Sequence, residues 1–250
     1  MNDNTTDIVN TDAAYVNSLE RAAIGFANGF VGYNFIYSII VALLIQFVTV
    51  TYNINTSNET LNVILMLITG LITLVLSVFV AGPTKLIKAY NKIGLTQVKL
   101  IIKTLFIMLI FTLSYNLFIS VLGVDVSGGN TNQTNVVMRI ISTPILSFIT
   151  FVLVAPISEE ITYRYFLFGG IRNIAPKFAV LISGFVFMAV HGMAGLFSSN
   201  SDILRELLLL PPYMFSGCML AYSYNKSNNL AVSTGVHVLN NLLSFILSVI

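Results

Sequence analysis

The sequence predicts an all-α protein, a polytopic transmembrane helical bundle with about seven spans, within a range of six to eight. Three observations predict this class. Of the 250 residues, 56% are hydrophobic and only 9% are charged, whereas a soluble domain carries about 25% charged residues. Several apolar stretches reach the roughly 20 residues that a helix needs to cross a bilayer. The Lys and Arg residues also gather on alternate loops, as they do in multi-pass membrane proteins.

The same composition excludes several classes of protein. With 12 Lys and Arg and 10 Asp and Glu, the chain cannot cover a globular surface with charge, which argues against a soluble enzyme and a disordered protein. Its net charge of +2 is too small for electrostatic capture of a polyanion. The single cysteine, Cys218, excludes an internal disulfide and a multi-cysteine metal site. We therefore expect the lipid bilayer as a partner and no nucleic acid.

Polar or turn-forming segments divide the apolar sequence into seven candidate spans. These spans are roughly 31–51, 61–81, 100–123, 146–170, 178–197, 204–223 and 230–250. Pro144 and Pro156 could break the fourth span, and the Pro211-Pro212 pair predicts a kink or break in the sixth, because proline removes a helix hydrogen bond. Glycines within the later spans are expected to permit close helix packing; they are Gly169, Gly170, Gly184, Gly192, Gly195 and Gly217.

Residues 1–30 are expected to form an N-terminal cytoplasmic or interfacial segment. The segment begins acidic and rich in Asn and Thr, and it lacks the basic n-region of a cleaved signal peptide. Its second half, 13–30, could lie on the membrane surface as an amphipathic helix. No internal repeat or second domain is visible in the sequence. Residues 31–250 are therefore expected to form a single transmembrane domain.

The Lys and Arg residues predict the orientation of the spans. Ten of the 12 fall on one side of the alternation: Arg21, Lys85, Lys88, Lys92, Lys99, Lys103, Arg164, Arg172, Lys177 and Lys226. The alternate loops 52–60 and 124–135 contain none, and only Arg139 and Arg205 lie on the other side. By the positive-inside rule, we expect the N-terminus in the cytoplasm and the C-terminus outside.

A few ionisable residues lie deep in apolar sequence. Burying such groups in a membrane costs free energy, and they usually have a function. They are the only two histidines of the chain, His191 and His237, and the adjacent carboxylates Glu159 and Glu160. If the chain turns near Ala175, Glu159 and His191 both lie 16 residues from the turn, about 24 Å along their helices. They would then lie side by side in an antiparallel pair.

His237 and Asn241 are expected at a compatible depth. They follow Asn229 by 8 and 12 residues, which is about 12–18 Å along their helix. Three helices could therefore bring both histidines, Glu159 and Asn241 to one buried level. The alternative is that each of these residues makes a separate hydrogen bond between helices.

Helix geometry separates the two glutamates. Glu160 and Arg164 are four residues apart with the acid first, the favourable order for an ion pair. We expect this pair to support the site electrostatically or simply to stabilise the helix. Glu159 projects about 100° away around the helix and has no such partner. A carboxyl group in apolar surroundings is suited to general base catalysis near neutral pH, which makes Glu159 the candidate base.

The remaining polar residues are compatible with two chemistries. His237 and Asn241 share one helix face, so their N–H groups could point at one oxygen and form an oxyanion hole. His191 could be held by Phe187, which precedes it by four residues. The alternative is a zinc ion bound by Glu159, His191 and His237, which is an ordinary ligand set. Asparagine is a poor zinc ligand and no HExxH motif is present, so a site without a metal or other cofactor is favoured.

Three short motifs, in order on successive spans, carry a resemblance to a known family. Glu159, Glu160 and Arg164 fit EExxxR, Phe187 and His191 fit FxxxH, and His237 and Asn241 fit HxxxN. Over about residues 145–250 the chain resembles the CPBP family of CAAX proteases and bacteriocin-processing enzymes, also called the Abi family. The resemblance implies a protease core in this range, whereas residues 1–140 contribute only hydropathy.

The resemblance implies an intramembrane endopeptidase in which Glu159 activates a water with help from His191. It also implies that His237 and Asn241 stabilise the tetrahedral intermediate. The expected substrate is a membrane-associated peptide or small membrane protein, such as a bacteriocin or pheromone precursor.

Two other functions stay open from the sequence. One is a non-proteolytic bacteriocin immunity or regulatory protein that binds a membrane partner. The other is a proton-coupled transporter, although transporters usually show repeated halves and none is visible here. The Asn- and Ile-rich composition suggests the cell membrane of a Gram-positive bacterium.

Overall fold

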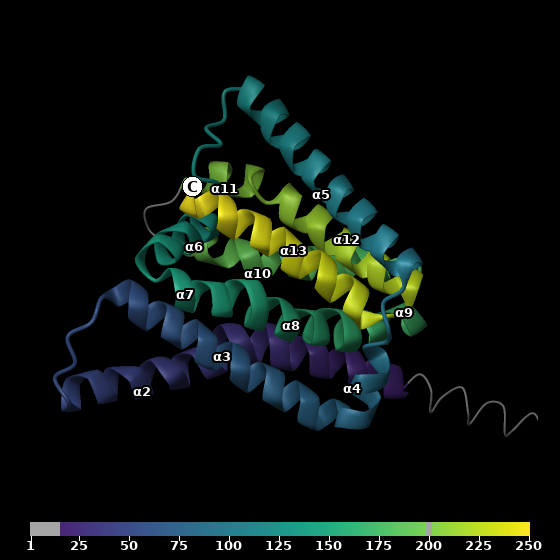
Figure 1. Ribbon diagram of the computed structural model, residues 1–250, viewed down its shortest axis with the longest axis horizontal. Helices are drawn as coiled ribbons and strands as arrows, with labels where there is room; N and C mark the ends of the chain where they lie inside the picture. The colour runs from purple at the N-terminus through teal and green to yellow at the C-terminus, as the bar shows by residue number, and fades with distance from the viewer. Residues whose placement is uncertain (1–15, 199–201) are drawn as a thin grey trace, which may run out of the picture.

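The computed structural model describes residues 16–198 and 202–250, and within these ranges all regular secondary structure is helical (Figure 1). The elements, with η for a π-helix, are η1 (Phe26–Tyr37), α2 (Ser38–Thr51), α3 (Asn58–Ala81), α4 (Pro83–Ala89), α5 (Leu95–Val121), α6 (Thr131–Ser142), α7 (Pro144–Ser147), η2 (Phe148–Val154), α8 (Ala155–Glu159), η3 (Glu160–Phe168), α9 (Gly169–Ile174), α10 (Ala179–Leu196), α11 (Ile203–Leu208), α12 (Pro211–Ser227) and α13 (Leu230–Val249). Among the described residues, six helical stretches are long and apolar enough to cross a membrane, and Ala179–Met193 is a shorter apolar helix. The predicted all-α bundle of about seven spans is therefore confirmed.

The N-terminal region differs from the sequence-based expectation. Residues 16–30 do not form a separate surface helix, because they are the first part of one helix, Val16–Thr51, that continues into the first span. Gly25 and Gly29 pack this helix directly against η3. A face of small residues therefore joins the segment to the bundle, where an amphipathic surface helix was expected. Residues 1–15 of the expected segment lie outside the described residues.

The helix that carries both glutamates is the centre of the bundle. Pro144–Ile174 runs without a break through α7, η2, α8, η3 and α9, and Figure 1 shows α7 and α8 between α13 and α3. Half of its most apolar 18-residue stretch is buried inside the bundle, whereas in the other candidate spans only 6–33% of that stretch is buried. Pro144 is the first residue of α7, where the missing N–H is harmless, and Pro156 is the second residue of α8, directly after the π-helical turn η2. Neither proline therefore breaks the fourth span.

The proline pair does break the sixth span, as its position predicted. Helix α11 ends at Leu208 and α12 begins at Pro211, where the missing N–H is harmless. Beyond this break α12 packs closely on α10, since a Cβ added at Gly217 would lie 2.9 Å from the Cα of Gly184. The close packing expected at these glycines is confirmed.

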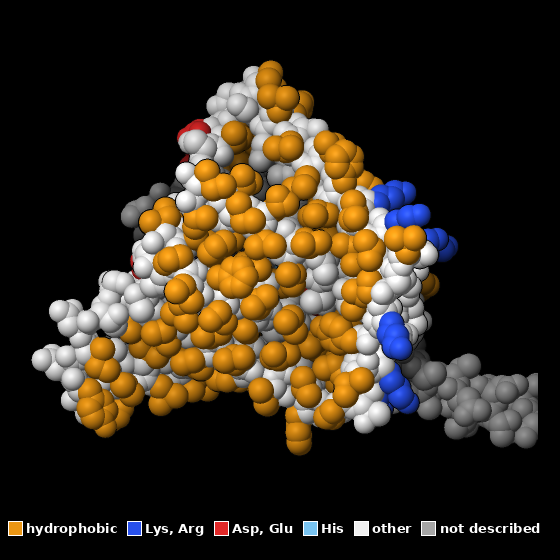
Figure 2. All heavy atoms as spheres, in the orientation of Figure 1, with side chains coloured by type: hydrophobic (Ala, Val, Ile, Leu, Met, Phe, Trp, Pro, Cys, Tyr) orange, Lys and Arg blue, Asp and Glu red, His pale blue; other side chains and the backbone are white. Residues whose placement is uncertain are grey.

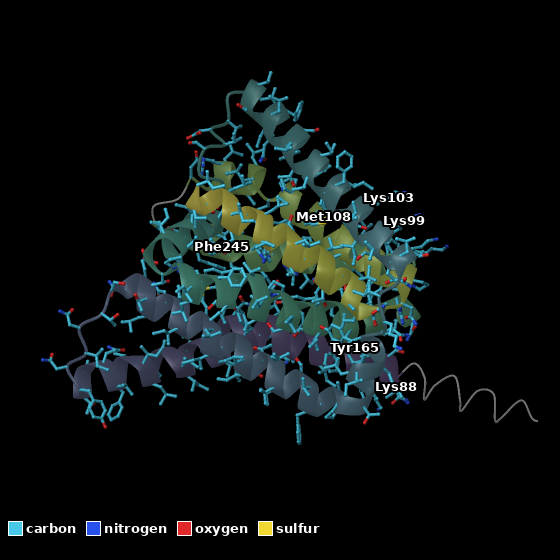
Figure 3. The ribbon with its side chains drawn as sticks, viewed as in Figure 1. Lys88, Lys99, Lys103, Met108, Tyr165 and Phe245 are labelled. Atoms are coloured by element: carbon cyan, nitrogen blue, oxygen red, sulfur yellow. The ribbon has the colours of Figure 1, made fainter. Side chains whose placement is uncertain are left out.

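Charged side chains divide the surface into two ends with an apolar belt between them. Figure 2 shows Lys and Arg at one edge, Asp and Glu at the opposite edge, and a broad hydrophobic surface in the middle. Lys88, Lys99 and Lys103 lie toward the first end together with Tyr165, while Phe245 lies toward the other (Figure 3). This distribution is that of a multi-pass membrane protein.

Candidate active site

A buried charged cluster joins the fourth span to the last. The Glu160 carboxylate of η3 lies 3.3 Å from Arg164 Nη1 and 2.9 Å from His237 Nδ1 of α13. The Glu160 and Arg164 side chains are fully buried, and His237 is nearly so. The ion pair predicted from the four-residue spacing therefore forms, and it also holds a histidine from a distant helix.

This cluster sets the tautomer of the His237 ring. An ionised carboxylate can only accept hydrogen bonds, so the proton of the contact with Glu160 belongs to Nδ1. The adjacent Arg164 charge favours the ionised form of Glu160 and hence this arrangement. The second ring nitrogen, Nε2, stays available for other groups, as in histidines that a carboxylate orients in catalytic sites.

Arg164 is held on its other sides as well. Its Nη2 donates to the backbone carbonyl of Gly217 at 3.3 Å, and its guanidinium lies 4.9 Å from the centre of the Phe187 ring. Taking two charges out of water is expensive, so a buried ion pair persists only with additional contacts of this kind. The guanidinium thereby ties η3 to both α10 and α12.

Glu159 faces a small pocket and stands apart from the buried ion pair. Its side chain is 19% exposed, and its Oε2 atom lies 3.9 Å from His237 Nε2. In the described part of the chain this oxygen has no hydrogen-bond partner. The pocket is lined by Gly29, Tyr33, Thr73, Ser158, Glu159, Thr162, Tyr163 and Val190. The structure thus shows the separation of the two glutamates that helix phase predicted.

His191 packs against two aromatic rings beside this pocket. Its ring centre lies 4.2 Å from that of Phe187 and 5.0 Å from that of Tyr213. Its Nδ1 lies 2.8 Å from the Phe187 carbonyl oxygen, and the residue before it lines the pocket. Phe187 also contacts His237, with ring centres 5.6 Å apart. Phe187 of α10 therefore contacts both histidine rings, one from its own helix and one from α13.

Asn241 makes a contact that its spacing did not predict. Its amide donates to the Phe151 carbonyl at 2.9 Å, while Nδ1 of the histidine one turn earlier contacts Glu160. Across the π-helical turn, the Ala155 N–H bonds to the Thr150 carbonyl, and Pro156 has no N–H to offer. The Phe151 carbonyl is therefore left without a helix partner. Such a buried carbonyl is costly, and Asn241 satisfies it.

The zinc site that the sequence left open would use one nitrogen of each histidine. Glu160 engages Nδ1 of His237, and a backbone carbonyl engages Nδ1 of His191, so each ring has one nitrogen left, as metal-binding histidines also do. Within residues 16–198 and 202–250, no group of three or more His, Cys, Asp or Glu side chains is placed to hold a metal ion.

One wall of the pocket comes from the half of the chain in which the sequence showed only hydropathy. Gly29 and Tyr33 belong to η1, and Thr73 belongs to α3. A signal was present in the glycines, because Gly25 and Gly29 are four residues apart, which is the pattern of closely packed membrane helices. That pattern predicts a close contact with another helix, but it does not indicate which helix is the partner.

Comparison with known proteins places the cluster inside a recognised domain. Residues 141–243 match the family model described as Type II CAAX prenyl endopeptidase Rce1-like. This range contains every residue predicted for the site, from Glu159 to Asn241. No solved structure matches the chain.

Two curated relatives come from Lactococcus lactis subsp. lactis (strain IL1403). The UPF0177 protein YvdC is 25% identical over 191 residues, which cover 76% of this chain and 68% of that protein. The UPF0177 protein YxdF is 31% identical over 136 residues, which cover 53% of this chain and 68% of that protein. With this similarity and the domain match, the chain belongs to the CPBP family of CAAX proteases and bacteriocin-processing enzymes.

Proposed function

We propose that this protein is an intramembrane endopeptidase that hydrolyses a membrane-associated peptide or small membrane protein. One observation carries the proposal. An unpartnered oxygen of Glu159 lies 3.9 Å from Nε2 of His237, whose other nitrogen is held by the buried Glu160 carboxylate. The name of the matching domain, a prenyl endopeptidase, supports the same class of reaction.

The spacing of these two atoms suits one water molecule. A water oxygen can lie about 2.8 Å from each of two atoms that are 3.9 Å apart. Glu159 would take a proton from this water, and the resulting hydroxide would attack the carbonyl carbon of the scissile peptide bond. A C–O bond forms, the C–N bond then breaks, and the proton passes from Glu159 to the leaving amine.

The surrounding charges favour Glu159 as the base. Glu160 and Arg164 form a buried pair whose charges offset each other. Glu159 is then the carboxylate of the site that is left to accept a proton. His191, packed beside the pocket, would assist it. The second N–H of the Asn241 amide, and His237 when Nε2 carries a proton, would act on the oxyanion. We further propose that the reaction needs no bound metal.

The proposal can be tested without knowing the substrate. Purified full-length protein in liposomes is incubated in oxygen-18-labelled water with peptides extracted from Lactococcus lactis membranes, and labelled new C-termini are counted by mass spectrometry. We expect wild type to produce them with or without a chelator. Glu159→Gln should produce essentially none at an unchanged melting temperature, whereas the exposed Glu20→Gln should match wild type.

The other outcomes are equally informative. Cleavage by Glu159→Gln at the wild-type rate would show that Glu159 does not activate the water. Loss of cleavage on chelation, with stoichiometric zinc in the purified protein, would replace the metal-free chemistry by a zinc site. A wild type that labels no peptide, with an intact immunity phenotype in Glu159→Gln cells, would favour the binding protein over the protease.

A further inference from the structure

The N-terminal helix is docked against the centre of the bundle with unusually little space. A Cβ added at Gly25 would lie 2.5 Å from the backbone nitrogen of Leu167, and one added at Gly29 would lie 2.1 Å from Thr162 Cγ2. Both of these partners belong to η3, the helix that begins at the second glutamate. Only glycine allows this approach, so the register of the N-terminal helix on η3 is closely determined.

This docking places Tyr33 in the Glu159 pocket. Tyr33 follows Gly29 by four residues, on the same side of the helix, and both line the pocket. Tyr33 of η1 and Glu159 of α8 line the same pocket from two different helices. Within the described residues this hydroxyl makes no hydrogen bond, whereas that of Tyr37, on the next turn, donates to Asn28 at 2.8 Å.

Both residues expected at the oxyanion already donate one hydrogen bond to an oxygen of the protein. The amide of Asn241 donates to the Phe151 carbonyl, and Nδ1 of His237 donates to Glu160. A carbonyl oxygen that becomes negative during hydrolysis needs hydrogen-bond donors that are already in place. Removal of one such donor typically lowers the rate by about 10²–10³. An uncommitted phenol at the wall of the pocket meets this requirement.

We infer that Tyr33 is a further catalytic residue of the proposed protease, whose hydroxyl donates a hydrogen bond to the carbonyl oxygen of the scissile bond as that oxygen becomes the oxyanion. The phenol keeps its proton throughout, so no bond to Tyr33 forms or breaks. The inference rests on the proposed function and adds the N-terminal helix to the active site. It predicts a specific loss of kcat when the oxygen atom alone is removed.

The test compares Tyr33→Phe with Tyr37→Phe in the liposome assay, with the most rapidly cleaved peptide of the membrane extract as the synthetic probe. Tyr33→Phe should lower kcat by about 10²–10³ with little change in KM. Tyr37→Phe removes a hydroxyl from the same helix but outside the pocket, and it should keep a kcat close to wild type. Melting temperatures of both variants control for folding.

A second substitution covers the case in which Tyr33→Phe is poorly folded. Incorporation of 3-fluorotyrosine at position 33 preserves the shape and makes the phenol a stronger donor, so kcat should change there and stay constant when position 37 is fluorinated. If kcat of Tyr33→Phe stays within about threefold of wild type while Glu159→Gln is inactive, Tyr33 is not catalytic and the protease proposal stands. If the wild-type protein cleaves no peptide, the proposed function is contradicted, and so is the catalytic role of Tyr33.

Discussion

Two adjacent glutamates occupy opposite environments in this protein. Glu160 is fully buried and contacts both Arg164 and His237, whereas Glu159 faces the pocket with a free oxygen. The cause is helix geometry, because consecutive side chains project about 100° apart and so reach different neighbours. One carboxylate can therefore hold the structure while the other stays available to react.

Glu160→Gln should destabilise the protein far more than Glu159→Gln. The first substitution leaves the Arg164 guanidinium buried without a counter-charge, and breaking one partner of a buried pair costs about 3–5 kcal/mol. The second removes a charge that has no buried counter-charge of its own. Thermal unfolding in detergent measures the difference. Equal melting temperatures for the two variants would show that the Glu160–Arg164 pair contributes little to stability.

The contact of Asn241 with a carbonyl freed by proline predicts energetic coupling between Asn241 and Pro156. Asn241→Ala leaves the Phe151 carbonyl unpaired, which should cost about 1–3 kcal/mol. In a Pro156→Ala background, residue 156 regains an N–H that can reach this carbonyl across the π-helical turn, so the same substitution should cost less. A double-mutant cycle on unfolding free energies measures the coupling.

Activity measurements on the same variants separate structure from catalysis. If Asn241 also stabilises the oxyanion, Asn241→Ala should lose about 10²–10³ in rate in both backgrounds but retain measurable cleavage. If its contribution is only to satisfy Phe151, the Pro156→Ala background should restore much of the rate. Strictly additive unfolding free energies would contradict the proline explanation itself.

At the scale of helices, the site depends on one glycine contact between η1 and η3. Gly29→Ala would place a methyl group 2.1 Å from Thr162 Cγ2, so the N-terminal helix must move outward. Overpacking of this kind costs about 1–3 kcal/mol, and the displacement should also lower cleavage because Tyr33 moves with the helix.

Gly94→Ala is the matched control for this prediction. A Cβ at Gly94 would meet only the flexible end of Gln97, at 3.2 Å, at a helix start far from the pocket. Melting temperature and cleavage rate should therefore stay close to wild type in Gly94→Ala and fall together in Gly29→Ala. An unchanged Gly29→Ala protein would mean that the N-terminal helix can shift without cost.

At the scale of the whole molecule, the two exceptions to the charge asymmetry each have a local explanation. Arg205 donates to the carbonyls of Asp125, Ser127 and Gly129 at 2.9–3.0 Å, which ties a loop to α11. Arg139 lies 3.5 Å from Glu59 at the start of α3. Both arginines contact partners at their own end of the bundle. The positive charge is therefore concentrated at the lysine-rich end.

This asymmetry predicts the topology in the membrane. A reporter fused within 85–99 should read cytoplasmic and one within 53–60 external, because positively charged loops are retained on the cytoplasmic side. A single reporter near the C-terminus at Ile250 should also read external. The opposite readout at both loop positions would invert the orientation and place residues 172–177 outside.

The sequence by itself determined the class of the molecule and the internal arrangement of single helices. Composition and span length predicted the helical bundle, and four-residue spacing predicted the Glu160–Arg164 ion pair and the packing of Phe187 on His191. These features are local, since a helix relates residues three or four apart in the same way wherever it lies.

Contacts between segments far apart in the sequence were decided only by the tertiary structure. They include the docking of residues 16–30 on η3, the presence of Tyr33 in the Glu159 pocket, and the hydrogen bond from Asn241 to Phe151. Periodicity shows which face of a helix is available, but the partner of that face depends on which helices meet and at what register. In this protein the register follows from glycine contacts and from one carbonyl freed by proline, and both act between helices.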